Sequence, residues 1–216
     1  MKRYDHLKRK AIEFRHQNMS LGDICQHLQL SKGTVYHWIK DIPANITPKQ
    51  TEAQKKGSRA CKVKYQKLRD EAYNLGLVEY PQLLQEPTFR DFVLVYMTEG
   101  YRRCRNQVSV ANSNGQMMAL VHYWFNRLCP NYKPEFMIQY HEDQSLSDLT
   151  TYWGNLLDMD PKQIRVQRKS NSGQLKGRKW RSLYGVLTIR CNNTYFRSRI
   201  QAWMDKIEAE WNTLGE

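Results

Sequence analysis

The chain lacks the features that mark membrane-spanning, disulfide-stabilised and zinc-binding proteins. No uninterrupted apolar stretch approaches the roughly 20 residues of a transmembrane helix, and the cationic N-terminus MKRYDHLKRK has no apolar run behind it. The five cysteines are odd in number and widely spaced, which argues against a disulfide framework. No CxxC, HxxxH or HExxH spacing occurs among the cysteines and six histidines, so zinc has no evident ligands. We therefore expect a soluble cytoplasmic protein without a membrane partner or an evident small-molecule ligand.

Acidic residues are scarce where basic residues are most concentrated. The formal net charge is +13, and residues 1–75 contain 16 Lys and Arg against 7 acids. Residues 160–200 contain 11 Lys and Arg and one acid, Asp160. Both blocks are typical of surfaces that face phosphates. A charge run is often only a solvated face, however, and RNA or a membrane surface would attract the same charge.

Two short helical patterns meet across a tight turn between Ser20 and Lys40. Ser20 is placed to cap a helix that starts at Leu21, with Asp23 completing a short capping-box variant, and Ser31 repeats this chemistry for a second helix. The apolar positions of both helices and the turn fall on one side: Ile24, Leu28, Leu30, Val35, Trp38 and Ile39. This pattern is typical of a helix-turn-helix, although a small helical hairpin that packs on another surface has the same spacing.

The second of these helices leaves donors, cations and a small residue on its outer side. They are Lys32, Gly33, Thr34, Tyr36, His37 and Lys40. Lys32 and Thr34, near the N-terminus of the helix, are placed for base edges or phosphates, and Lys40 for the backbone beyond. Together with the net charge, this face predicts a recognition helix for double-stranded DNA, which would associate the protein with the nucleoid of a bacterial or phage-infected cell.

The chain divides into three predicted segments. A helix over about residues 5–17 completes a trihelical helix-turn-helix domain in residues 1–42. Two prolines in IPANITP disfavour helix and open a basic linker, residues 43–86. Within it, residues 49–74 predict an exposed basic helix that either lies along a phosphate backbone or is a plain solvated spacer. Residues 87–216 form the second domain.

The second domain is predicted to be of the α+β class. Helices are expected over residues 89–98, 114–128, 146–157 and 195–211, and strands over 107–111, 134–140, 164–168 and 183–190. The first of these helices stops at Glu99-Gly100, where glycine permits a left-handed end. A carboxylate on the last turn of a buried helix meets the negative end of the dipole and loses water. We therefore expect a compensating partner for Glu99, with a divalent cation as the obvious candidate.

Several segments of this domain resemble the LAGLIDADG homing endonucleases and the nuclease-derived DNA-binding proteins that share their fold. FVLVYMTEG occupies the place of the motif helix, and VSVANSN, the Tyr152-Trp153 pair and YGVLTIRCNNTYFRSRIQAW stand at corresponding places. The order of elements is similar to that of prokaryotic and phage proteins that join a helix-turn-helix to one such unit. The resemblance implies an antiparallel, saddle-shaped sheet with helices on one face and the major groove on the other. It also implies that Glu99 of two packed helices would share divalent metal over the DNA.

Two sets of residues in this domain are predicted to contact DNA. Arg165, Gln167 and Lys169 alternate on one side of a strand, as do Thr188 and Arg190 on another, and such a face places Arg and Gln at base edges. The loop between these strands, residues 169–181, is polar and strongly cationic. We expect this loop to order on DNA and to meet phosphates through Lys176, Arg178, Lys179 and Arg181.

Two functions of different classes follow from these patterns. The first is a sequence-specific DNA-binding regulator of transcription or of a mobile element, which does not cut and needs no cofactor. The second is a Mg-dependent homing-type endonuclease. Because only one motif copy is present, the second carboxylate would come from the other subunit of a homodimer, with magnesium activating water for strand scission. Binding of structured RNA is a third, weaker alternative.

Overall fold

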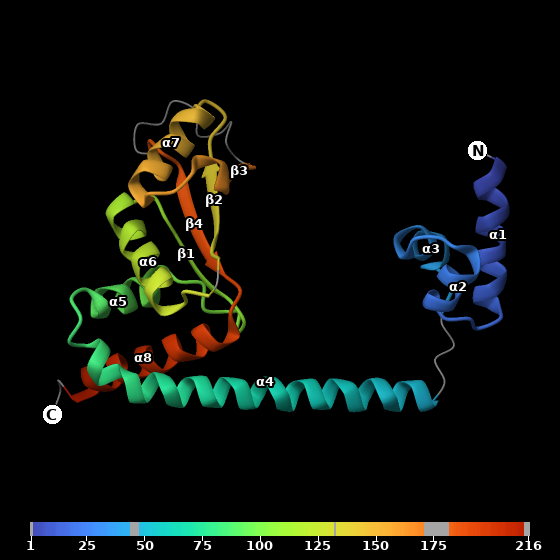
Figure 1. Ribbon diagram of the computed structural model, residues 1–216, viewed down its shortest axis with the longest axis horizontal. Helices are drawn as coiled ribbons and strands as arrows, with labels where there is room; N and C mark the ends of the chain where they lie inside the picture. Colours follow the sequence, from blue (N-terminus) through green and yellow to red (C-terminus); the bar gives the residue numbers. More distant parts are fainter. Residues whose placement is uncertain (1, 44–47, 132, 171–181, 214–216) are drawn as a thin grey trace. The chain divides into compact units, whose positions relative to one another are not determined.

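The computed structural model describes residues 2–43, 48–131, 133–170 and 182–213. Contacts divide the chain into two compact units, Met1–Lys62 and Val63–Glu216 (Figure 1). Each unit has a hydrophobic core of its own. The boundary at Lys62 falls within one long helix, α4 (Pro48–Leu83). The second half of the segment expected to be linker therefore belongs to the C-terminal unit.

The N-terminal unit begins with three helices, α1 (Lys2–His16), α2 (Leu21–Leu28) and α3 (Lys32–Ile39). The predicted helix starts at Leu21 and Lys32 are confirmed. Ala11, Ile24, Val35 and Ile39 form the buried centre, and the predicted apolar residues Leu28, Leu30 and Trp38 pack around it. The three helices contact one another pairwise around this core.

Serine residues cap the starts of α2 and α3. The Ser20 hydroxyl accepts from the Asp23 N–H at 3.2 Å, and the Ser31 hydroxyl accepts from the Thr34 N–H at 3.3 Å. Gln29, which directly follows α2, has a left-handed backbone with φ of 52°. Each cap is expected to contribute about 1 kcal/mol, because it pairs an otherwise free N–H at the helix start.

The C-terminal unit contains every helix and strand predicted for residues 87–216, with bounds that differ by a few residues at most. In chain order the elements are α5 (Phe89–Glu99), β1 (Val108–Asn112), α6 (Gly115–Leu128), β2 (Glu135–Tyr140), α7 (Leu146–Leu157), the 3-10 turn η1 (Pro161–Gln163), β3 (Ile164–Arg168), β4 (Val186–Cys191) and α8 (Thr194–Asn212). The unit is thus of mixed α+β composition, as expected.

The sheet has the strand order β1-β4-β2-β3 and is mixed. β4 pairs antiparallel with both β1 and β2, but β2 and β3 run parallel. The expectation of an entirely antiparallel sheet is therefore wrong. The physical reason is that α7 lies between β2 and β3 in the chain. The connection through α7 returns the chain to the end of the sheet at which β2 began, so β3 runs in the same direction as β2.

Helices cover one face of this sheet and form the core with it. α6 contacts β1 and β4, and α7 contacts β3. The side chains that alternate toward these helices are apolar and buried, among them Val110, Ile138 and Ile189. Aromatic rings fill the space beyond the sheet. Phe89 lies 5.3 Å from Trp124 and 5.1 Å from Trp203 between ring centroids, in edge-to-face pairs that add to the energy of burial.

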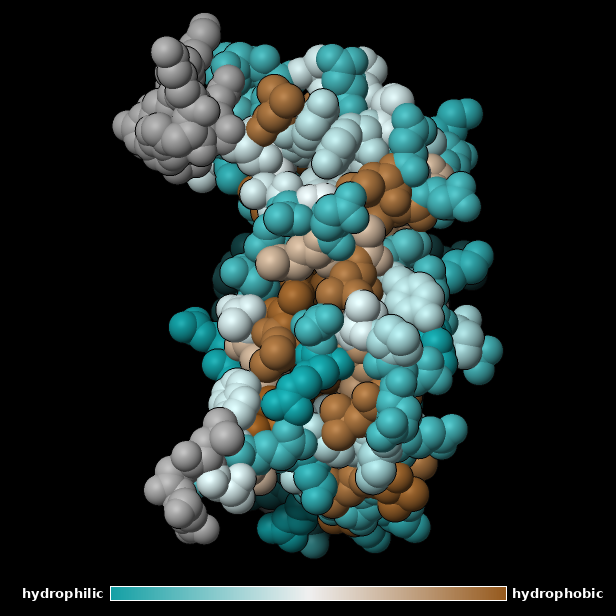
Figure 2. Space-filling model, turned by 90° about the vertical axis from the view of Figure 1, so that its left-hand side faces the viewer, coloured by the Kyte–Doolittle hydropathy of each residue, from teal (hydrophilic) through white to brown (hydrophobic). Residues whose placement is uncertain are grey.

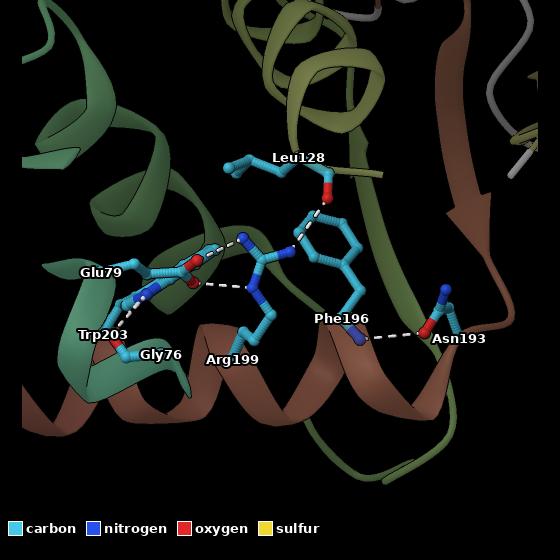
Figure 3. Close-up of polar contacts among 7 residues, drawn as sticks. All are labelled: Gly76, Glu79, Leu128, Asn193, Phe196, Arg199 and Trp203. Carbon is cyan, nitrogen blue, oxygen red and sulfur yellow. Dashed lines mark hydrogen bonds and ion pairs between the residues drawn. The ribbon is translucent and has the colours of Figure 1, made fainter. Parts of the chain in front are cut away.

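The C-terminal half of α4 packs on α8 through a set of specific contacts (Figure 3). The Trp203 indole N–H donates to the Gly76 carbonyl at 3.1 Å. The Arg199 guanidinium donates to both carboxylate oxygens of Glu79, at 2.6 and 2.8 Å, and to the Leu128 carbonyl at 3.0 Å. These contacts join α4, α6 and α8 and make residues 72–83 part of the folded unit.

An apolar band reaches the surface on the helix-covered side of the C-terminal unit (Figure 2). Partly buried apolar side chains from three helices pack at the margin of the core: Leu94, Val95 and Met97 of α5, Leu120 of α6 and Leu156 of α7. Hydrophilic residues border the band, as the view shows. The face that we expected to meet DNA is the other face of the sheet.

Candidate nucleic-acid interface

The exposed side of α3 carries the residues predicted for recognition. Lys32, His37 and Lys40 are exposed, and the Tyr36 ring is 57% exposed. The opposite side of the helix is held in the core by Val35 and Ile39, so α3 cannot rotate without losing that burial. The α3 surface, as we call Lys32, Tyr36, His37 and Lys40, is therefore presented outward by a rigid support.

Thr34 differs from the other predicted residues of α3. Its side chain is half-buried, and its hydroxyl lies 2.9 Å from the Ser31 hydroxyl. Its backbone N–H is also bonded to Ser31. Thr34 thus takes part in the helix cap, and only the remaining hydrogen-bonding capacity of its hydroxyl is available to a base edge.

The second predicted surface is the face of the sheet that lies opposite α6 and α7. Strand register decides its composition, because paired residues share a face. Arg190 pairs with Ser109 and Glu135, and Thr188 pairs with Met137, which in turn pairs with Arg165. Two residues after Arg165 on β3, Gln167 pairs with Gln139 of β2. The predicted residues Arg165, Gln167, Thr188 and Arg190 therefore do lie together on one face, which we call the open face.

A small hollow lies in the open face. Its walls include Met137, Arg165, Thr188 and Arg190, with Glu135 at one side. The Arg190 Nε is buried and has no hydrogen-bond partner. Arg165 and Gln167 are exposed on β3, an edge strand, whereas Thr188 is buried on the inner strand β4. The face thus offers guanidinium and amide donors from β3 and β4, which are separated by β2 and therefore lie about 10 Å apart, twice the spacing of paired strands.

Most of the predicted loop, residues 171–181, lies outside the described residues. Lys169 follows β3, is half-buried, and donates its backbone N–H to the Tyr140 carbonyl at 2.9 Å. The other predicted phosphate contacts, Lys176, Arg178, Lys179 and Arg181, lie outside the described residues. Their role stays a prediction from the sequence.

Glu99 does not have the environment that we expected. It is the last residue of α5, but its side chain is exposed, whereas Tyr96 one turn earlier is buried. Water therefore solvates the carboxylate, and the argument that burial demands a compensating cation is wrong. Among the described residues, no group of three or more His, Cys, Asp or Glu side chains is arranged to hold a metal ion.

Gly100 has a different structural role from the predicted one. Its backbone is extended, with φ of −77° and ψ of 142°, so the expected left-handed helix end is wrong. A side chain at this position would come within 2.7 Å of the Tyr96 ring. Glycine is needed here because the chain turns back closely over the end of α5 before it enters β1.

Burial shifts the pKa values of two titratable groups of the C-terminal unit in the direction that favours their neutral forms. Burial raises the pKa of the Tyr96 hydroxyl, and the nearby Arg197 opposes this shift. Burial lowers the pKa of His122 on α6. Neither group lies on the α3 surface or the open face, so these shifts belong to the packing of the unit and not to the predicted interface.

Sequence reasoning missed a cluster of arginines beside the sheet. Arg102, Arg103 and Arg105 lie between α5 and β1 and are exposed. They meet Arg197, which is buried in the first turns of α8. The run RRCR was visible in the sequence, but its meeting with α8 depends on the pairing of β1 with β4, which brings residues 108 and 191 together.

Comparisons with known proteins do not assign the chain to a family. No family model, curated protein or solved structure matches it. None of the helices within the described ranges is both long enough and apolar enough to cross a membrane.

Proposed function

We propose that the protein is a sequence-specific double-stranded DNA-binding regulator. The observation that carries this proposal is the α3 surface, in which two lysines, a histidine and a tyrosine project from the second helix of a helix-turn-helix arrangement. A helix fits the major groove of B-DNA, where each base pair presents a distinct set of donors and acceptors. The excess of basic residues supplies attraction to the phosphates.

The open face supports the proposal as a second DNA-contacting surface. Arg165 and Arg190 can each donate two parallel hydrogen bonds to a guanine edge, and Gln167 can pair with adenine. These side chains come from β3 and β4, which both pair with β2, so that their spacing is fixed by the backbone ladder. In this proposal the C-terminal unit is a LAGLIDADG-like domain that binds without cutting, and the two units act as tandem modules whose affinities reinforce each other.

The test is selection from randomised duplex DNA with the full chain, in the presence and absence of magnesium. Bound fragments and newly formed ends are both sequenced. A regulator enriches a motif among intact fragments. His37→Ala should change the preferred bases in one part of the motif, whereas His16→Ala, which removes an exposed histidine at the end of α1, should leave it unchanged. A lack of any enriched motif would refute the proposal.

The open face has its own matched pair of variants. Gln167→Ala removes an exposed amide from the open face, and Gln163→Ala removes one from η1 outside it. We expect Gln167→Ala to lower discrimination at one position of the motif by about 1–3 kcal/mol, the usual worth of a bidentate base contact. Equal effects of the two variants would show that the open face does not read sequence.

A second candidate function is a Mg-dependent DNA endonuclease. It rests on the exposed carboxylate of Glu99 at the end of α5, where a second copy of the chain could approach it. One chain does not supply a complete metal site among its described residues, so cutting would require a homodimer. The apolar band beside α5 is the surface on which the two copies would meet. Magnesium-dependent ends in the selection that disappear in Glu99→Gln would establish this function.

A further inference from the structure

A pocket of about 520 Å³ lies in the C-terminal unit, between the C-terminal half of α4, the segment that joins α5 to β1, and the first turns of α8. Five of its lining residues are arginines and one is an acid. The acid is Asp70, and the arginines are Arg69, Arg102, Arg103, Arg105 and Arg197. We call this cavity the arginine pocket. An exposed cluster of cations alone would be an ordinary solvated surface. This pocket differs from such a surface because its inner wall is a buried arginine.

Arg197 forms that inner wall and is only 6% exposed. Its guanidinium donates to the Gln201 side-chain oxygen at 3.0 Å and to the Arg102 carbonyl at 3.4 Å, and it lies 5.7 Å from the centre of the Tyr96 ring. Its Nε is buried without a hydrogen-bond partner. Within the described ranges no carboxylate forms an ion pair with Arg197. A buried charge without a counterion is costly, which makes the site favourable for an anion.

The acids around the pocket are already engaged with neutral groups. Asp70 accepts from the Gln66 amide at 2.7 Å. Asp205, further along α8, accepts from the Tyr73 hydroxyl at 2.8 Å and from the Gln201 amide at 2.6 Å. These contacts hold both carboxylates away from a direct pairing with Arg197, so the pocket keeps an excess of positive charge.

We propose that the arginine pocket binds a phosphate group, carried either by the backbone of duplex DNA or by a free polyphosphate. Guanidinium groups are planar forks that bond two oxygens at once, and a tetrahedral phosphate presents oxygens to several such forks together. Arg197 contacts the phosphate from the inner wall, and Arg102, Arg103 and Arg105 close around it from the α5–β1 segment. No sequence reading is involved in this contact.

The position of the pocket relates it to the open face. The Tyr101 N–H donates to the Ser109 carbonyl at 2.8 Å, so the arginine segment runs beside the outer edge of β1. Ser109 pairs with Arg190, which lies on the open face. A duplex on that face would bring its backbone toward the pocket. This DNA-backbone source rests on the proposed function, whereas binding of a free polyphosphate does not.

The experiment titrates the full chain with pyrophosphate by calorimetry, in a phosphate-free buffer of constant ionic strength. Three variants are compared with the wild type. Arg103→Ala/Arg105→Ala removes two exposed pocket residues, Arg197→Lys removes the fork at the inner wall, and Lys206→Ala removes an exposed cation elsewhere on α8. We expect saturable binding that weakens about tenfold or more in the double variant and is unchanged in Lys206→Ala. If Arg197→Lys fails to fold, the double variant, whose changes are exposed, decides alone.

A second arm measures binding of duplex DNA to the same variants over a range of salt concentrations. If a backbone phosphate occupies the pocket, the double variant should lower the slope of log affinity against log salt by about 1, the value for one phosphate contact. Lys206→Ala should not change it. If the double variant weakens only pyrophosphate binding, the phosphate group in the pocket comes from a free polyphosphate. If the double variant changes only the salt slope of DNA binding, the phosphate group comes from the DNA backbone.

The proposal is overturned if the double variant matches Lys206→Ala in both arms. If the wild-type chain binds no duplex at all, the proposed function fails, while the pyrophosphate titration still decides the pocket. The two failures are therefore distinguishable.

Discussion

Replacement of Gly76 by alanine should destabilise the C-terminal unit, although alanine favours helix. Gly76 lies in α4 where this helix crosses α8 most closely. A Cβ atom at this position would lie 2.9 Å from the Ala202 Cβ and 2.9 Å from the Arg199 carbonyl oxygen. Real Cβ atoms do not approach backbone atoms so closely, so the two helices would have to separate. Separation would also stretch the hydrogen bond from Trp203 to the Gly76 carbonyl.

The magnitude follows from two opposing effects. Insertion of a methyl group into a packed interface usually costs about 1–3 kcal/mol. The better helix propensity of alanine returns up to about 1 kcal/mol. Taking about 2 kcal/mol for the insertion and a return of about 1 kcal/mol, the net loss is about 1 kcal/mol, which for a unit of this size lowers the thermal midpoint by about 2–4 °C.

The assay is thermal unfolding of the full chain followed by near-ultraviolet circular dichroism. Three tryptophans, Trp124, Trp153 and Trp203, are fully buried in the C-terminal unit, so the signal reports its packing. Gly57→Ala is the matched control, because it makes the same change in the same helix at a position with nothing within 4 Å. We expect no loss of stability there. A rise in the midpoint for Gly76→Ala would refute the close packing of α4 on α8, and with it one wall of the arginine pocket.

Three further predictions concern caps and ion pairs. Ser31→Ala should destabilise α3 by about 1 kcal/mol through loss of its cap, which hydrogen exchange would detect as faster exchange in α3 with α8 unaffected. Glu79→Gln should lower the stability of the C-terminal unit by about 2 kcal/mol in urea unfolding, because Arg199 would lose a charged acceptor in a largely buried place; an unchanged midpoint would contradict this. The Tyr80 hydroxyl lowers the pKa of the Glu210 carboxyl by hydrogen bonding. The stability that the ionised Glu210 carboxylate adds is therefore present at neutral pH and is lost as the pH falls through its lowered pKa. The difference in unfolding midpoint between wild type and Glu210→Gln should consequently shrink on acidification.

Local sequence signals predicted most of the elements because their physical causes are local. Ser20, Ser31, Asn114 and Ser145 each cap the helix that follows, since a short polar side chain there bonds a free N–H. Alternating apolar residues marked the strands. The errors arose where a local rule was extended beyond its range. Gly100 was expected to end α5 in a left-handed conformation, but the turn into β1 required an extended backbone and no side chain.

We also expected Glu99 to be buried, and this second prediction was wrong because it rested on a local pattern alone. The apolar residues of α5 indicated a buried helix, and its first two turns are indeed in the core. Its last turn emerges from that core because Tyr96 is the final residue of α5 that is buried. Whether a polar residue at a helix end is buried depends on where the neighbours stop, which no pattern within the helix records.

The sequence by itself determined the positions of the helices and strands, the outward set of polar residues on α3, and the alternation that places Arg165 and Gln167 on one side of β3. Caps, periodicity and charge act over a few residues, and they are therefore readable in order along the chain. Only the tertiary structure decided that β3 runs parallel to β2, that the second half of α4 packs on α8, and that Arg197 meets the RRCR segment in one pocket. These features depend on contacts between residues about 90 to 130 positions apart or on the direction of a crossover, and such contacts form only when the whole unit folds.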